Sequence, residues 1–138
     1  MVHTGKFVLS TKGFCDIVDV TGKVAAEAEN SGIENGSVTV FCPGSTCSVT
    51  TIEYEPGVVS DLARVIETLV PSNVPYEHDR RWGDGNGFSH VRAALLKPSL
   101  TIPFLKKKMA LGTWQQIVFI DFDNRKRSRE IIVQVIGE

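Results

Sequence analysis

Two polar segments of this chain carry residue types that core packing does not select. Residues 83–90 are glycine-rich and end in a histidine, while residues 110–117 hold a threonine, a tryptophan and two glutamines. Glycine lets a backbone approach a ligand closely and adopt left-handed conformations. Asp, His, Trp and Gln supply a charge, a titratable proton, a stacking face and an amide. We therefore expect the two segments to form one small-molecule site.

Two histidines lie in or beside the first segment and not on an apolar stripe, namely His78 and His90. Neutral imidazole binds zinc and similar metals, and it titrates near neutral pH. With Asp84 or Glu53 as a carboxylate partner, the pair predicts a catalytic site that holds a divalent metal, zinc or magnesium, or handles a proton. The alternative is that each imidazole only hydrogen-bonds the loop and holds its shape.

The second segment offers candidate substrate-binding residues in Thr113, Trp114 and Gln115. Gly112 and Thr113 permit close backbone approach, and free N–H groups in such a turn can receive an anion. Gln115 has an amide that can orient a substrate amide or ring nitrogen. Core or interface packing is the alternative for Trp114, because an indole buries a large apolar area.

Three arginines alternate along residues 125–129, so an extended backbone would place them on one face. Guanidinium groups bind phosphate in a bidentate geometry that lysine lacks. Arg127 is therefore a candidate phosphate ligand on the rim of the site. A solvated hairpin turn is the alternative.

Cys42 and Cys47 flank a four-residue turn and are close enough in sequence to meet if the flanking strands pair. A buried structural role is the interpretation that the pattern favours, because free cysteine behaves as a small hydrophobic residue. A catalytic thiol at Cys47 is the alternative, since the turn neighbours the predicted site.

Composition limits the class of protein. The 138 residues suit a single domain covering residues 1–138, with 42% apolar residues for its core. The net charge of −1 gives no argument for a nucleic-acid partner. No apolar run approaches the roughly 18 residues of a membrane span, and no secretory signal is visible. With three cysteines and no C-x-x-C spacing, we expect a reduced, cytoplasmic protein.

Periodicity predicts an α+β domain built on a β-sandwich. Apolar and β-branched runs predict seven strands, at residues 6–11, 14–20, 37–42, 47–54, 99–105, 116–122 and 130–136. The first two are expected to pair across the turn at residues 12–13. Helical patterns cover residues 21–32, 56–70 and 89–96, and residues 72–88 read as a long functional loop.

The combination of motifs resembles the YjbQ-like family over nearly the whole chain. The motifs that carry the resemblance are Gly112-Thr113-Trp114-Gln115, Ser99-Leu100-Thr101-Ile102-Pro103, Tyr76-Glu77-His78-Asp79, Ser89-His90 and Val133-Gln134-Val135-Ile136-Gly137-Glu138. The resemblance implies a seven-stranded, two-layer β-sandwich with helices, assembled as a homotrimer. The run of apolar residues 117–120 is consistent with a sheet that needs cover on both faces.

One segment departs from the family pattern. Many members carry His-Thr-Thr or His-Thr-Ser where this chain has Gly44-Ser45-Thr46. Thr46 remains a candidate substrate-binding residue, but the histidine is absent. The resemblance also supports a site role for Glu53 and phosphate contact by Arg127.

Three functions stay open. Some members have thiamine-phosphate synthase activity as a secondary function, which implies an enzyme acting on a phosphorylated heterocycle. That reaction needs a pyrophosphate pocket, a divalent cation and an aromatic platform. The alternatives are a metal-dependent hydrolase, in which a His-bound metal activates water, and a non-catalytic trimer that binds a small anionic ligand. None of the familiar nucleotide-binding, hydrolase or metalloprotease motifs is present.

Overall fold

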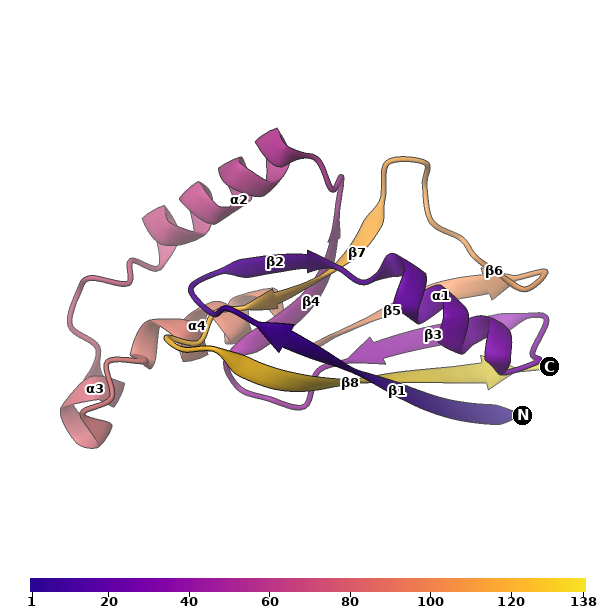
Figure 1. Cartoon of the computed structure of the whole chain (residues 1–138), viewed down its shortest axis with the longest axis horizontal. Helices are drawn as coiled ribbons and strands as arrows, with labels where there is room; N and C mark the ends of the chain where they lie inside the picture. The colour runs from indigo at the N-terminus through magenta and orange to yellow at the C-terminus, as the bar shows by residue number, and fades with distance from the viewer.

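The strands of the computed structural model, which describes residues 1–138, form two curled antiparallel sheets (Figure 1). The larger sheet has the strand order β1-β8-β3-β5-β6, and the smaller has the order β2-β7-β4. The strands are β1 (Val2–Thr11), β2 (Asp16–Asp19), β3 (Gly36–Phe41), β4 (Cys47–Ile52), β5 (Ser99–Leu105), β6 (Lys108–Met109), β7 (Gln116–Asp121) and β8 (Arg127–Gly137). The helices are α1 (Thr21–Asn30), α2 (Pro56–Leu69), α3 (Glu77–Trp82) and α4 (Gly87–Leu96).

The two sheets share one apolar core because their strands alternate inward and outward residues. In β8, Ile131, Val133 and Val135 are fully buried. They pack in the same cluster as Phe119 of β7 and Val24 of α1. The outer face of the larger sheet has no helix over it.

The central strand of the smaller sheet is apolar on both faces. Ile117 and Phe119 face the shared core, while Val118 and Ile120 face a second cluster formed with α2 and α4. All four residues are fully buried. The cover that the apolar run 117–120 requires therefore comes from within the subunit.

The predicted pairing of the first two strands is wrong. β1 pairs with β8, and β2 pairs with β7 in the other sheet. Phe14 and Cys15 take left-handed conformations, with φ of 53° and 68°. Their N–H groups donate to the carbonyls of Asp123 and Asp121, at 2.8 and 2.9 Å. The chain thus crosses between sheets at residues 14–15, and the second strand begins only at Asp16.

The segment predicted as a loop, residues 72–88, contains the short helix α3. Gly83 ends this helix in the left-handed conformation, with φ of 67°. The next helix begins at Gly87, two residues before the predicted start at Ser89. The Ser89 hydroxyl donates to the Asn86 carbonyl at 2.7 Å, so it does not cap the helix as predicted. Six residues are too few for a helical period to be recognised in sequence.

The remaining predicted elements are confirmed, with small shifts of their ends. The run predicted at 47–54 ends at Ile52, and a two-residue strand, β6, is added beside β5. In no helix of this structure is there an apolar stretch long enough to span a bilayer.

Candidate functional site

Two imidazoles meet where α3 packs against α4, at the end of the molecule opposite the chain termini (Figure 1). The ring centroids of His78 and His90 lie 4.5 Å apart, with the planes tilted by 35°. The Nδ1 atom of His78 lies 3.4 Å from a carboxylate oxygen of Asp79 and 3.4 Å from one of Asp84. Three of the residues predicted for the site are thus brought together, and Asp79 joins them.

Backbone N–H groups hold the two carboxylates in place. Gly87 donates to Oδ1 of Asp79 at 2.8 Å, and Asn86 donates to Oδ1 of Asp84 at 3.2 Å. The turn between the helices needs Gly85, whose φ is 64°. A Cβ on Gly87 would lie 2.6 Å from Cβ of Tyr76, so only glycine allows α4 to begin this close to α3. The glycines predicted to favour a ligand therefore also shape the loop.

Two of the three distances between the donor atoms of these residues suit a small divalent cation. Ligand atoms about 2.1 Å from a tetrahedral ion lie about 3.4 Å apart. The two distances from His78 Nδ1 match that edge, and the donor atoms of His78, Asp79 and Asp84 all lie within 4.8 Å of one another. Each carboxylate oxygen that accepts a backbone hydrogen bond keeps a second lone pair for a metal.

A cavity of about 250 Å³ lies beside His90. Gly44, Ser45 and Cys47 form one wall, and α4 forms another with Ala93 and Ala94. Gly44 stands where the resemblance places a histidine in many relatives. The missing side chain widens this cavity, because a Cβ on Gly44 would lie only 3.0 Å from Sγ of Cys47.

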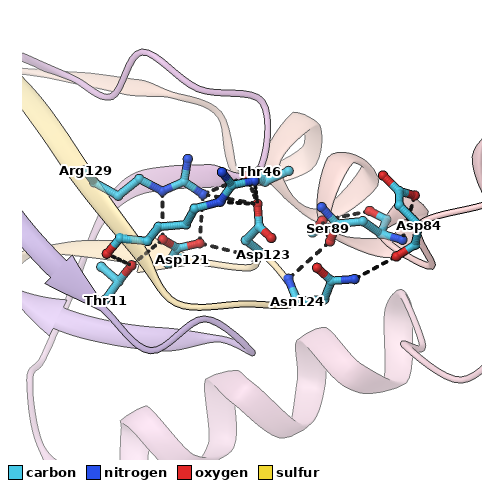
Figure 2. A network of polar contacts seen from close by, with 10 residues as sticks. Thr11, Thr46, Asp84, Ser89, Asp121, Asp123, Asn124 and Arg129 are labelled. Atoms are coloured by element: carbon cyan, nitrogen blue, oxygen red, sulfur yellow. Dashed lines mark hydrogen bonds and ion pairs between the residues drawn. The ribbon is translucent and has the colours of Figure 1, made fainter. Parts of the chain in front are cut away.

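A buried ionic network lies next to this cavity, at the junction of β7 and β8 (Figure 2). Asp121 and Asp123 are fully buried. Arg129 donates to both oxygens of Asp121, at 2.8 and 3.0 Å, and to the Thr46 hydroxyl at 2.7 Å. Thr46 donates to Asp123 at 3.0 Å, and Arg127 pairs with the same carboxylate at 2.9 Å. Two guanidinium groups therefore neutralise two carboxylates in the interior.

The network sets the protonation of its members. Burial alone would raise the pKa of Asp123, but hydrogen bonds from Thr46 and Arg127 and the two guanidinium charges hold it below the usual 3.8. Hydrogen bonding to Asp121 raises the pKa of Arg129. One oxygen of Asp123, Oδ1, is buried without a hydrogen-bond partner. Both aspartates were missed in the sequence, where they read as the end of an apolar strand.

The β7–β8 turn also supports the loop of the imidazole site. Asn124 donates its side-chain amide to the Asp84 carbonyl at 2.9 Å, and its N–H to Oδ1 of Asn86 at 3.2 Å (Figure 2). The buried network and the imidazole pair are therefore parts of one framework.

The arginines do not form one free cationic face. Arg127 and Arg129 both bind buried aspartates, while Arg125 lies in the turn before β8 and is exposed. Thr46 is likewise buried within the network. Phosphate contact by Arg127 and substrate contact by Thr46 stay predictions, and in this structure both side chains have protein partners.

The second predicted segment lies elsewhere. β4 and β7 pair with Cys47 opposite Asp121 and with Ile52 opposite Gln116, so Glu53 and Gln115 lie at the far end of this ladder. Six residues of extended chain span about 20 Å. Within one subunit, the expected single pocket for the imidazoles, Glu53 and Gln115 does not form.

At that far end, Gln115 is engaged in local hydrogen bonds. Its amide donates to the Thr51 hydroxyl at 3.2 Å, and its oxygen accepts from the Gly112 N–H at 3.1 Å. The Gly112 N–H, one of the backbone donors that were expected to receive an anion, is thus occupied. Thr113 is exposed, and Trp114 is 73% exposed, so the indole does not pack in the core of its own subunit.

Comparison with known proteins assigns nearly the whole chain to one protein family. The profile of the family described as UPF0047 protein YjbQ-like matches residues 5–138. This chain belongs to that family. A UPF0047 protein of Methanothermobacter thermautotrophicus is 38% identical over 137 residues, covering 99% of this chain and 94% of the relative. One from Archaeoglobus fulgidus is 36% identical over 131 residues, covering 95% and 99%.

Solved structures agree with this assignment. A YbjQ-like protein of unknown function from Sulfolobus solfataricus superposes with a TM-score of 0.94 at 29% identity, covering 100% of this chain and 99% of that one. A hypothetical protein from Aeropyrum pernix superposes with a TM-score of 0.91 at 32% identity, covering 99% of each chain. The YjbQ-like fold expected from the sequence is confirmed.

Proposed function

We propose that this YjbQ-like protein is a metal-dependent enzyme that acts on a phosphorylated small molecule. The observation that carries the proposal is the placement of His78 Nδ1 at 3.4 Å from carboxylate oxygens of both Asp79 and Asp84. Three ligands leave a further position on a cation open, which is the arrangement of catalytic metal sites. We place the substrate in the cavity lined by His90, whose ring lies 4.5 Å from that of His78.

Each residue of the site has a proposed role that follows from its position. His78, Asp79 and Asp84 would hold the cation, and a divalent cation there would stabilise negative charge on phosphate oxygens. His90 stacks on His78 and lines the cavity, so it is placed to pass a proton between substrate and solvent. The paired state of Arg127 and Arg129 leaves the cation as the main positive charge for a phosphate.

Thiamine-phosphate formation, implied by the resemblance, is the first reaction to assay within this class, followed by hydrolysis of simple phosphate esters. Both reactions involve phosphorylated substrates and a divalent cation.

The homotrimer belongs to this proposal as well. The outer face of the larger sheet bears exposed apolar side chains at Val2, Val8, Phe41 and Ile136, all at least 39% exposed, and no helix covers it. Such a face suits a neighbouring copy. Glu53 and Gln115 would reach the imidazole site only if they came from another subunit.

Metal binding is the test of the site. Equilibrium dialysis with zinc and with magnesium should show one bound ion per chain, and His78→Ala should weaken binding about tenfold or more. His3→Ala is the matched control, because His3 lies on β1 in the larger sheet, outside the imidazole site. Equal affinity of wild type and His78→Ala would refute the metal site.

Turnover is tested separately. With the metal present, His90→Ala should lower the rate by on the order of 10²-fold, the usual scale for an acid–base group. A chelator should abolish the wild-type rate. A wild type that binds metal but turns over neither substrate type would instead favour the non-catalytic, ligand-binding trimer.

A further inference from the structure

A second set of reactive side chains lies in the same cavity wall and takes no part in the proposed metal chemistry. Cys42 and Cys47 bracket the turn between β3 and β4, and both are buried free thiols. The two thiols belong to one apolar cluster, and each shifts the pKa of the other. Only the four residues of the turn separate the two cysteines, so a disulfide between them would close a small loop.

Only one of the two thiols borders the cavity. Cys47 lines it together with Gly44 and His90, whereas the Cys42 thiol donates a hydrogen bond to the Pro98 carbonyl at 3.4 Å. A Cβ on Gly44 would lie 3.0 Å from Sγ of Cys47 and 3.3 Å from a guanidinium nitrogen of Arg129. A side chain at position 44 would therefore crowd both the sulfur and a nearby cation.

The charges around Cys47 favour its thiolate. The interaction with the Cys42 thiol is the largest effect lowering the pKa of Cys47, and the Arg129 guanidinium adds to it against burial and the Asp121 charge. The same interaction, together with burial, raises the pKa of Cys42 strongly, and burial raises that of Cys15. Among the three thiols, Cys47 is the one poised to act as nucleophile.

We propose that Cys47 is a peroxide-reactive thiol and that Cys42 is its resolving partner. The Cys47 thiolate attacks a hydroperoxide, so that an S–O bond forms, the O–O bond breaks, and the alkoxide or hydroxide leaves and takes up a proton. Cys42 then attacks the sulfenic acid, so that the S–S bond forms and water leaves with the thiol proton. The hydroperoxide is the oxidant, and the pair of thiols supplies two electrons.

The proposal does not depend on the metal site. Its consequence is nevertheless local to that site, because the disulfide would bridge the turn whose Thr46 belongs to the buried network. Oxidation is expected to rearrange the cavity wall opposite α4.

The test is stoichiometric hydrogen peroxide added to the fully reduced protein, followed by intact-mass measurement and peptide mapping. Wild type should lose two hydrogen masses, with Cys42 linked to Cys47. Cys42→Ser should instead gain one oxygen and react with dimedone, and Cys47→Ser should do neither. Cys15→Ser is the matched control and should behave as wild type.

Two further measurements use protein with all three thiols. Chloroacetamide, which is small and neutral, should alkylate Cys47 before the more exposed Cys15. Gly44→Ala should slow both oxidation and alkylation of Cys47 several-fold, because its Cβ narrows the approach to the sulfur. Alkylation of Cys15 first, or peroxide-treated wild type without the Cys42–Cys47 link, would overturn the proposal.

Discussion

Replacing Arg129 tests whether the buried network holds the β7–β8 end of the molecule together. Its side chain is only 12% exposed and is shared between Asp121 and Thr46. In Arg129→Ala, Asp121 keeps a single side-chain partner, the Thr11 hydroxyl at 2.6 Å, while it remains fully buried. An uncompensated charge is then left in the interior.

The size of the effect follows from what is left unpaired. Removing one partner of a buried ion pair costs about 3–5 kcal/mol of unfolding free energy. Arg129→Lys keeps the charge but loses the fork that reaches both Asp121 oxygens, at 2.8 and 3.0 Å. We expect it to cost about 1.5–3 kcal/mol, the value of one hydrogen bond to a charged group.

The assay is urea unfolding followed by circular dichroism at neutral pH, with equal m-values as the condition for comparison. Arg125→Ala is the matched control, because Arg125 is exposed in the neighbouring turn, and its effect should stay within about 0.5 kcal/mol. If Arg129→Ala is no more destabilising than Arg125→Ala, the network does not stabilise the fold and the reasoning fails.

Five other substitutions, one alone and four in two matched pairs, probe three separate features. Because the pKa of Asp123 is lower in the folded protein than its usual 3.8, its ionised carboxylate adds to the free energy of unfolding above that pH, and this contribution is lost as the pH falls through the folded pKa. In Asp123→Asn, the free energy of unfolding should therefore fall less steeply below about pH 4 than in wild type. An equally steep fall in both proteins would contradict this. Phe119→Ala should cost about 3–5 kcal/mol in urea unfolding because the ring is fully buried, and Val8→Ala, on the exposed outer face, under about 0.5 kcal/mol. Gly36→Ala should lower the melting temperature of the protein, because its Cβ would lie 2.0 Å from a carbonyl oxygen of β8. Gly22→Ala has open space around its Cβ and should stabilise α1 by about 0.5–1 kcal/mol. Thermal melts that rank the two glycine variants in the opposite order would refute both expectations.

Local pattern was enough for the elements with a clear period or a clear boundary. The helix predicted after Pro56 forms from Pro56 to Leu69, and the carboxylate of Glu55 accepts the N–H groups of Gly57 and Val58 at its start. The last predicted strand was recognisable because alternate residues of β8 are buried. Neighbouring residues determine such features, so the sequence suffices to predict them.

Part of the site was also readable. His78, Asp84 and His90 lie within thirteen residues of one another, and two helices joined by a short turn keep them close. Asp79 went unnoticed beside His78, although its neighbour's imidazole was a signal. The ionic role of Asp121 and Asp123 had no local signal, because Thr46 is 77 residues from Asp123. Arg129 is eight residues from Asp121, but the two meet only because β7 and β8 lie in different sheets and join at this turn.

Only the tertiary structure decided which distant segments meet. Residues 110–117 looked like a partner for the imidazole loop, yet the β4–β7 register places Gln115 at the other end of the ladder. Likewise, residues 14–15 looked like the start of a hairpin strand. Hydrogen bonds to the carbonyls of Asp121 and Asp123 hold them in left-handed conformations, and the chain passes from one sheet to the other there. Composition and spacing determine what an isolated segment can form, whereas register and sheet order depend on burying apolar faces that belong to several segments at once.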